Sequence, residues 1–298
     1  MTITFVTGAT GFIGNRLVNS LEGEIRILSR IEHPDFQTII CDLSSEKIPV
    51  NALKNVDTVF HLAGFTHDNR HGDKVADQYY KINVSATIQL ANLSVRSGVK
   101  KFIFISSVKA GGRPLRDKSL KEHEQSEPDG IYGRTKREAE IELLKIAKDS
   151  SMHVSIIRPS LVYGPNVKGN LKLMLFGIQK GWFPPLPLNK NMRSMVHVDD
   201  LVAAIRLVSN CEKTNGEIYN VTDNEKYSTR DIYETICVKL GKKIPNWYMP
   251  YSLLYFFSKF HPKFKILFTK LFDSECYSSE KINKIGFIPK KKFKDFNT

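Results

Sequence analysis

Two polar residues, Tyr132 and Lys136, stand four positions apart in a segment rich in Glu, Lys, Ala and Leu. This composition predicts a helix over residues 132–148, on which positions four apart share one face. A lysine ammonium beside a tyrosine favours the phenolate, so we expect Lys136 to lower the pKa of Tyr132 and make it a general acid and base. Ser107 comes two residues after the apolar run 101–105, which predicts a strand, and its hydroxyl could hold a substrate oxygen against Tyr132. The three residues together predict a catalytic site, although Ser107 alone could cap a loop and Tyr132 alone could simply pack.

A glycine-rich turn precedes this site in the chain, between the apolar run 3–6 and a predicted helix over 16–21. Glycines permit a sharp turn and let the backbone approach a pyrophosphate, and the helix N-terminus offers free N–H groups. The turn could also be purely structural, because strand–helix turns rich in glycine occur without ligands. The strand and helix on its two sides favour a dinucleotide site. Its predicted cofactor contacts are Gly8, Thr10, Gly11, Phe12, Ile13 and Gly14.

The end of the second predicted strand bears on the choice of cofactor. NAD sites usually place an acidic residue there, about 20 residues beyond the glycine turn, to hold the ribose 2′-hydroxyl. This chain has Leu28-Ser29-Arg30 instead, with Glu32 and Asp35 further on. A guanidinium suits a 2′-phosphate, so we predict NADP(H), with NAD as the alternative if Arg30 merely lies on the surface.

Composition limits the class of protein. The chain has 298 residues, of which 41% are hydrophobic and 25% charged, as in an ordinary globular protein with one large core and a smaller lobe. It shows no signal peptide, and no apolar run approaches the ~20 residues that span a bilayer. The four cysteines have neither zinc-ligand nor disulfide spacing. We therefore expect a cytoplasmic protein with reduced thiols and no metal site.

Apolar segments alternate with helical patterns through the first half of the chain, which predicts an α/β fold: a Rossmann-type doubly wound parallel sheet with a smaller C-terminal substrate lobe. The predicted strands are 25–28, 37–40, 58–62, 101–105, 154–157 and 218–221, after the first at 3–6, and the longer predicted helices are 73–97, 132–148 and 199–209. We expect residues 1–165 to form the dinucleotide-binding domain, with 193–222 returning to it, and residues 166–192 and 223–298 to form the substrate lobe.

In order and type, these motifs resemble the extended short-chain dehydrogenases/reductases, the NAD-dependent epimerases and dehydratases. The resemblance rests on the glycine turn, Asp42-Leu43, Leu62-Ala63-Gly64, Asn83, Ser107, Tyr132 with Lys136, and Arg158-Pro159. It implies Ser107, Tyr132 and Lys136 as the catalytic triad and a nicotinamide cofactor that carries hydride. It further implies that Asp42 and Leu43 lie near the adenine and Asn83 near the nicotinamide-side ribose. The remaining implied cofactor contacts are Leu62, Ala63, Gly64, Tyr132, Lys136 and Pro159, and the implied assembly is a homodimer through residues 73–97 and 132–148.

Residues after Ser107 bear on the reaction. The acidic pair of the related 4,6-dehydratases is replaced here by Val108-Lys109, and the Val-Tyr-Gly of many 4-epimerases by residues 110–112, Ala-Gly-Gly. Residues 106–109, 163–170 and 193–196 most resemble a subgroup that acts on UDP-N-acetylhexosamine derivatives. The leading hypothesis is therefore hydride transfer at C4 that reduces a UDP-4-keto-6-deoxy-N-acetylhexosamine. The expected substrate contacts are Thr66, Lys109, Lys168, Asn170 and Arg193.

Two alternatives to this hypothesis stay open. One is a 4-epimerase of a nucleotide sugar, or of an N-acetylhexosamine linked to polyprenyl diphosphate. The other is a cofactor-binding redox sensor without turnover, against which the intact Ser107, Tyr132 and Lys136 argue because a sensor does not need them.

The C-terminal segment carries most of the net charge of +13. From Lys239 to the end there are thirteen lysines and four acidic residues, which suggests an anionic partner. Phenylalanines recur every fourth residue from Phe256 to Phe272, with lysines between them. Residues 251–272 could therefore contact a membrane surface, which would make the protein peripheral at the inner membrane. They could also form a lid helix that packs its phenylalanines into the substrate lobe, with a break at Pro262 in either case. We expect a nucleotide-sugar substrate and no nucleic-acid partner.

Overall fold

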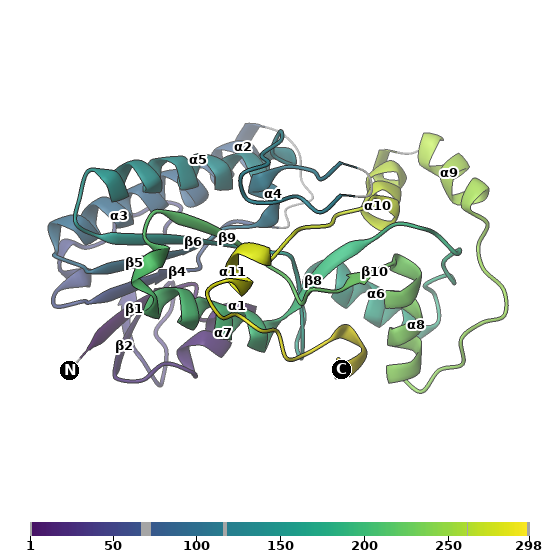
Figure 1. Cartoon of the computed structure of the whole chain (residues 1–298), viewed down its shortest axis with the longest axis horizontal. Coiled ribbons are helices and arrows are strands. Elements are labelled where there is room, and N and C mark those ends of the chain that lie inside the picture. The colour runs from purple at the N-terminus through teal and green to yellow at the C-terminus, as the bar shows by residue number, and fades with distance from the viewer. Residues whose placement is uncertain (1, 67–72, 116–117, 261, 297–298) are drawn as a thin grey trace.

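A seven-stranded parallel sheet forms the centre of the protein, with strand order β3-β2-β1-β4-β5-β6-β9 (Figure 1). The computed structural model describes residues 2–66, 73–115, 118–260 and 262–296. The order reverses beside β1, where open α/β sheets bind ligands at the carboxyl ends of the strands. The fold class predicted from the sequence is confirmed. The strands are β1 (Ile3–Thr7), β2 (Glu24–Ser29), β3 (Gln37–Ile40), β4 (Thr58–His61), β5 (Lys101–Ile105), β6 (His153–Pro159) and β9 (Glu217–Val221).

Helices cover both faces of this sheet, which explains why its central strands carry apolar residues at consecutive positions. In β1, Val6 packs in one core with Leu17 and Leu201, whereas its neighbour Phe5 packs in a second core with Leu90. Adjacent side chains of a strand point to opposite faces, so both faces require apolar residues. The first core lies under α1 (Phe12–Val18), α7 (Val198–Asn210) and α11 (Glu280–Asn283), and the second under α3 (Ala86–Arg96), α5 (Gly130–Lys148) and the short 3-10 helix η1 (Val50–Leu53).

The helix predicted over 73–97 is interrupted in the structure. It consists of α2 (Asp73–Tyr80), the π-helical turn η2 (Lys81–Ser85) and α3. Asn83 lies in the π-helical turn and is fully buried. Single π-turns inside α-helices often occur at functional sites, because they redirect one side chain.

A smaller three-stranded sheet forms the framework of the C-terminal lobe, in the order β10-β8-β7. Its strands are β7 (Leu161–Tyr163), β8 (Arg193–His197) and β10 (Lys226–Tyr227), and its helices are α6 (Gly169–Lys180) and α8 (Thr229–Lys239). The helix α8 begins with a capping box of Ser228 and Asp231. Two 3-10 turns, η3 (Glu212–Thr214) and η4 (Phe293–Asp295), complete these connections.

The division between the two units differs from the expected one at two places. Within residues 193–222, β9 joins the large sheet and α7 packs on it, whereas β8 pairs with β7 and β10 in the small sheet. Conversely, Ile282 and Phe287 belong to the first core of the large sheet, although residues 223–298 were assigned to the lobe. Long-range packing brings this part of the tail back across the sheet.

The segment with the recurring phenylalanines forms a helical hairpin of α9 (Tyr251–Phe260) and α10 (Pro262–Phe272). This hairpin lies at one end of the long axis of the molecule (Figure 1). A helix starts at Pro262, in keeping with the break predicted there, because proline fits the first turn of a helix and disrupts its interior. Among the residues that the structure describes, no helix is both long and apolar enough to cross a bilayer.

Candidate active site

The glycine turn lies between the carboxyl ends of β1 and β4, and its geometry excludes larger residues. Gly8 has a φ of +72°, and a Cβ on it would stand 2.7 Å from the backbone nitrogen of Ala63. A Cβ on Gly14 would stand 2.0 Å from the carbonyl oxygen of Gly8, so helix and strand could not approach this closely with any other residue. The Gly11 N–H donates to the Gly8 carbonyl oxygen at 3.0 Å and closes the turn just before α1. This cradle at the point where the strand order reverses fits a dinucleotide pyrophosphate.

The loop after β4, Leu62 to Gly64, runs beside this cradle and is tied to the helices by Asn83. The Asn83 amide accepts the Phe65 N–H at 2.7 Å and donates to the Phe65 carbonyl and to Thr135 Oγ1. A Cβ on Gly64 would stand 3.2 Å from Lys136 Nζ and 3.3 Å from Asn83 Oδ1. The amide of Asn83 thus links the loop to α5, and its place near the ribose stays a prediction.

Ser107 and Tyr132 meet at the carboxyl end of β5. Ser107 is the N-cap of the short helix α4 (Val108–Gly111), and its hydroxyl accepts the Lys109 N–H at 3.2 Å. Tyr132 lies in the first turn of α5, close enough to Ser107 for the serine side chain to lower its pKa. The Tyr132 ring also has an edge contact with Tyr79, with ring centroids 6.4 Å apart. The two hydroxyls predicted to act together are thus adjacent.

The pKa of Tyr132 differs from the expectation. Burial raises it to about 12, and the hydrogen bond with Ser107 offsets only part of this effect. The Lys136 ammonium donates to the Ile105 carbonyl at 3.0 Å and stands 4.5 Å from the Phe104 ring centroid. Burial in turn lowers the pKa of Lys136 to about 8, against a smaller opposing effect of Glu140. Desolvation of both groups therefore outweighs the mutual effect that their spacing predicts.

The buried Lys136 predicts an alkaline rise in stability. Between about pH 8 and its ordinary pKa of 10.5, Lys136 is mostly neutral in the folded protein and charged in the unfolded one. The unfolded state then binds more protons, so the free energy of unfolding rises with pH, by up to about 1.4 kcal/mol per pH unit for one proton. Urea unfolding at pH 7.5, 9 and 10 should show this rise in the wild type and a flatter profile in Lys136→Met. The exposed Lys148→Met on the same helix should keep the wild-type slope, and equal slopes in all three proteins would contradict the assignment.

Two expected substrate contacts, Lys109 and Arg193, converge on a carboxylate that the sequence analysis missed, Glu275. Lys109 Nζ is 2.6 Å from Glu275 Oε1 and 2.6 Å from Asp129 Oδ2. The Arg193 guanidinium is 3.8 Å from Glu275 and also donates to the carbonyl of Lys270. Burial raises the pKa of Glu275, but Lys109 and Arg193 together hold it below its usual value. These cations bind protein carboxylates that join α4 to the C-terminal tail, which leaves less of their charge for a substrate.

The other predicted contacts are more dispersed. Lys168 and Asn170 are exposed at the start of α6, and Thr66 is exposed next to residues 67–72, which lie outside the described residues. Arg30 is exposed after β2. Two hydrogen bonds from Ser44 lower the pKa of Asp42, and the positive charge of Arg30 lowers it further by a smaller amount. Thr10 is exposed, while Phe12, Ile13, Leu43, Leu62 and Ala63 are half-buried, and Pro159 is buried at the end of β6.

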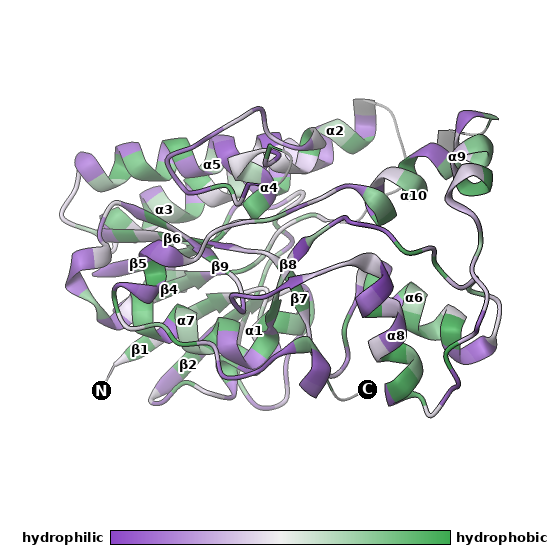
Figure 2. Cartoon of the chain, turned by 45° about the vertical axis from the view of Figure 1, so that its right-hand side comes forward, coloured by the Kyte–Doolittle hydropathy of each residue, from purple (hydrophilic) through white to green (hydrophobic). Residues whose placement is uncertain are grey.

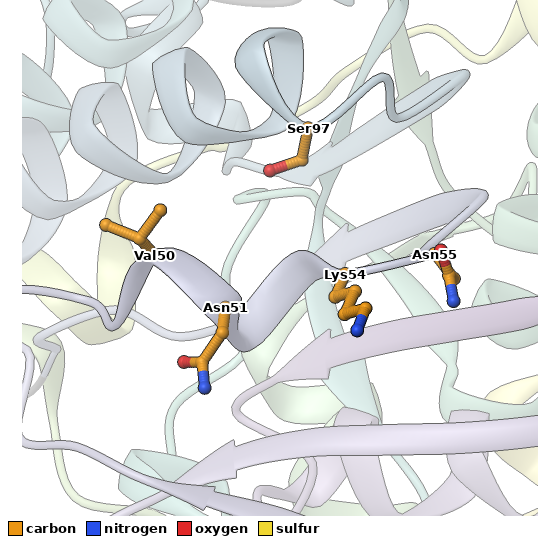
Figure 3. Close-up of a pocket in the computed structure, with 5 residues that line it drawn as sticks. All are labelled: Val50, Asn51, Lys54, Asn55 and Ser97. Carbon is orange, nitrogen blue, oxygen red and sulfur yellow. The ribbon is translucent and has the colours of Figure 1, made fainter.

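A hollow outside this site is lined by Val50, Asn51, Lys54, Asn55 and Ser97 (Figure 3). Its residues precede β4 and β5 in the chain, so it lies at the amino edge of the sheet. Ligands of doubly wound sheets bind at the opposite, carboxyl edge. We therefore place the active site at the glycine turn and the Ser107–Tyr132 pair.

Comparison with known proteins identifies the family of the chain. Residues 4–222 match the model of the NAD dependent epimerase/dehydratase family, the range that holds the glycine turn and all three catalytic candidates. The chain belongs to this family. Family membership establishes an NAD(P)-dependent enzyme, because the matched range includes the nucleotide-binding fold.

Two curated relatives of this family member are 4-epimerases by name. The UDP-glucose 4-epimerase of Vibrio cholerae is 34% identical over 258 residues, which are 82% of this chain and 77% of the relative. The N-acetyl-alpha-D-glucosaminyl-diphospho-ditrans,octacis-undecaprenol 4-epimerase of Escherichia coli O157:H7 is 29% identical, over 83% of this chain and 75% of the relative.

Two solved structures share the fold across both units. MoeE5 in complex with UDP-glucose and NAD superimposes with a TM-score of 0.79 and 24% identity, covering 98% of this chain and 95% of MoeE5. The UDP-glucose 4-epimerase of Thermotoga maritima, with UDP-glucose, also gives 0.79, with 20% identity and coverage of 99% and 96%. At this identity the likeness concerns the fold, and it includes the C-terminal lobe.

Proposed function

We propose that the protein is a 4-epimerase of a hexose carried on a diphosphate, with a nucleotide sugar as the first substrate class to test. The observation that carries the proposal is that Ser107 and Tyr132 lie next to each other, beside the glycine turn and Lys136. The pair supports proton transfer at a hydroxyl carbon next to a bound nicotinamide. Both curated relatives described above are 4-epimerases, so we place epimerisation ahead of the 4-keto-sugar reduction that the sequence favoured.

The chain's own residues divide the work at the C4 hydroxyl. A bound oxidised nicotinamide supplies a reversible hydride acceptor for C4–H. The positive charge of a bound oxidised nicotinamide would favour the phenolate form of Tyr132. This phenolate would take the hydroxyl proton as the C4–O double bond forms, and Ser107 would donate a hydrogen bond to that oxygen. The neutral Tyr132 would then return the same proton to the C4 oxygen, which gives the hydroxyl of inverted configuration. Lys136, next to the 62–64 loop, orients the ribose, and Asn83 keeps that loop in place.

For the cofactor we propose a retained dinucleotide. An epimerase returns the hydride that it takes, so the dinucleotide need not leave between turnovers, whereas a reductase must exchange it.

Arg30 bears on whether this dinucleotide is NADP(H) or NAD. Its guanidinium supports binding of a 2′-phosphate, which only NADP(H) carries. Against this, Arg30 is exposed and lies near the charged Asp42. The MoeE5 structure was solved with NAD. The mass of the dinucleotide released by acid from the purified protein decides between NAD and NADP(H).

We also propose the homodimer that the family resemblance implied, through α2–α3 and α5. Its support is apolar exposure on these helices: Tyr80 in α2, Val95 in α3 and Ile141 in α5 all expose more than a third of their surface. The helices α3 and α5 are neighbours on one face of the sheet, so the two could form one contact surface.

The decisive assay supplies substrate and no reducing cofactor. Purified protein with UDP-glucose or UDP-N-acetylglucosamine should produce the C4 epimer until equilibrium is reached, as followed by NMR of the anomeric protons. Ser107→Ala should slow this by about 10²-fold or more, because the hydroxyl partner of Tyr132 is lost. If instead a 4-keto sugar consumes NADPH stoichiometrically and neither UDP sugar epimerises, the protein is the reductase.

A further inference from the structure

The α9–α10 hairpin stands apart from both cores and is held together by its own aromatic residues. Tyr251 contacts Phe268 and Phe272 across the two helices, with ring centroids 5.2 and 5.4 Å apart. Tyr255 contacts Phe268 at 5.8 Å. These contacts use one side of each helix. Among the described residues of the hairpin, Leu271 and Phe272 at the end of α10 pack against the core of the lobe.

The rest of the hairpin exposes many apolar side chains. Phe260 is 70% exposed and Phe256 55% exposed, and their ring centroids are only 4.6 Å apart. Figure 2 shows both helices at the far end of the molecule, with hydrophobic residues interrupted by hydrophilic ones. Soluble monomers rarely expose large contiguous apolar surfaces unless these bind something. We define the hairpin patch as Trp247, Tyr248, Leu253, Phe256, Phe257, Phe260, Ile266 and Leu267, all of them more than a third exposed.

The charges around this patch indicate what covers it. Residues 251–272 contain four lysines and neither aspartate nor glutamate, and Lys259, Lys265 and Lys270 are exposed. A second copy of the same hairpin would bring like charges together, so self-association through this patch is disfavoured. An anionic surface that also accepts aromatic side chains satisfies both features, and the bilayer interface of acidic phospholipids is such a surface.

The dimensions of the hairpin fit a position on the membrane rather than through it. The helix α9 has 10 residues and α10 has 11, about half of what a bilayer core requires. Aromatic residues with neighbouring lysines are typical of helices that lie in the headgroup region. Lys259 illustrates this pairing, since its ammonium stands 4.8 Å from the Tyr255 ring centroid.

We propose that the α9–α10 hairpin docks the protein on anionic bilayers. The hairpin is also tied to the active site, because Arg193 donates to the Lys270 carbonyl and Glu275 binds Lys109 two residues after Ser107. A docked hairpin therefore holds the mouth of the site beside the membrane, where a sugar on a polyprenyl diphosphate would be presented. The docking itself stands apart from the proposed reaction and is measured without turnover.

The test is flotation of the full chain with vesicles. At about 50 mM salt the wild type should float with phosphatidylcholine vesicles that contain 30% phosphatidylglycerol, and much less with phosphatidylcholine alone or at 500 mM salt. The double variants Phe256→Ser/Phe260→Ser and Lys259→Glu/Lys265→Glu should each lower the bound fraction by roughly tenfold. Circular dichroism checks that the variants fold.

Matched controls come from α6 in the same lobe. Phe176 is exposed, with the Lys180 ammonium 5.8 Å from its ring centroid, and Lys172 is exposed one turn earlier. Phe176→Ser and Lys172→Glu should float like the wild type. Absence of flotation at low salt would overturn the proposal, as would equal binding by wild type and hairpin variants. A dimer that dissociates only in Phe256→Ser/Phe260→Ser would assign the patch to a second copy instead.

Discussion

Replacing Tyr132 by phenylalanine should lower kcat for C4 epimerisation by about 10³-fold while changing the affinity for the dinucleotide less than about threefold. The substitution removes only the hydroxyl that binds Ser107 and exchanges the C4 proton, and general acid–base groups contribute about 10²–10⁴-fold. The ring and its edge contact with Tyr79 remain. The measurement pairs the initial rate of epimer formation with a fluorescence titration of the emptied protein by NAD and NADP.

Tyr79→Phe is the matched control for this variant. Tyr79 is a neighbouring tyrosine, 5% exposed, and its ring contacts both Phe65 and Tyr132. Its hydroxyl has no place in the proposed proton transfer, so turnover should stay within a few-fold of the wild type. Near-normal turnover in Tyr132→Phe, or an equal loss in Tyr79→Phe, would rule out Tyr132 as the acid–base group.

Features set by short stretches of chain were predictable from the sequence. The glycine turn is one, because the φ of Gly8 and the contact between Gly14 and the Gly8 carbonyl arise within seven residues. The shared helix of Tyr132 and Lys136 is another, because a spacing of four fixes a common face. The order of strands and helices followed for the same reason, from local apolar runs.

Features that depend on tertiary contacts were not predictable. Lys109 meets Glu275 across 166 positions of sequence, and no spacing rule connects them. The raised pKa of Tyr132 depends on burial, which only the packed site defines. The phenylalanine stripe was visible in the sequence, but the exposure of Phe256 and Phe260 depends on where the lobe ends. A periodic pattern indicates a helix face and leaves open what covers it.

Arg158→Met and Glu140→Gln should each lower the free energy of unfolding by about 3–5 kcal/mol, the cost of removing one partner of a buried ion pair. Arg158 in β6 and Glu140 in α5 are 1% exposed, and Arg158 Nε donates to Glu140 Oε1 at 2.8 Å as part of a bidentate pair. A Cβ on Gly111 would stand 3.0 Å from the Arg158 guanidinium, so this group also packs under α4. The pair thus joins the three elements that surround Ser107 and Tyr132. Urea unfolding at neutral pH measures the loss.

The double variant Arg158→Met/Glu140→Leu separates the loss of an interaction from the cost of an orphaned charge. Two apolar residues of similar volume avoid the uncompensated charge, and such replacements are often neutral or stabilising. The double variant should therefore be more stable than either single variant. If the two substitutions acted independently, their losses would add and the double variant would be the least stable. The exposed pair of Lys145 and Glu142 on the same helix is the control, and Lys145→Met should cost at most about 1 kcal/mol. Losses as small as this in Arg158→Met and Glu140→Gln would show that water or a rearranged neighbour solvates the remaining charge, and that the pair does not hold α5 against β6.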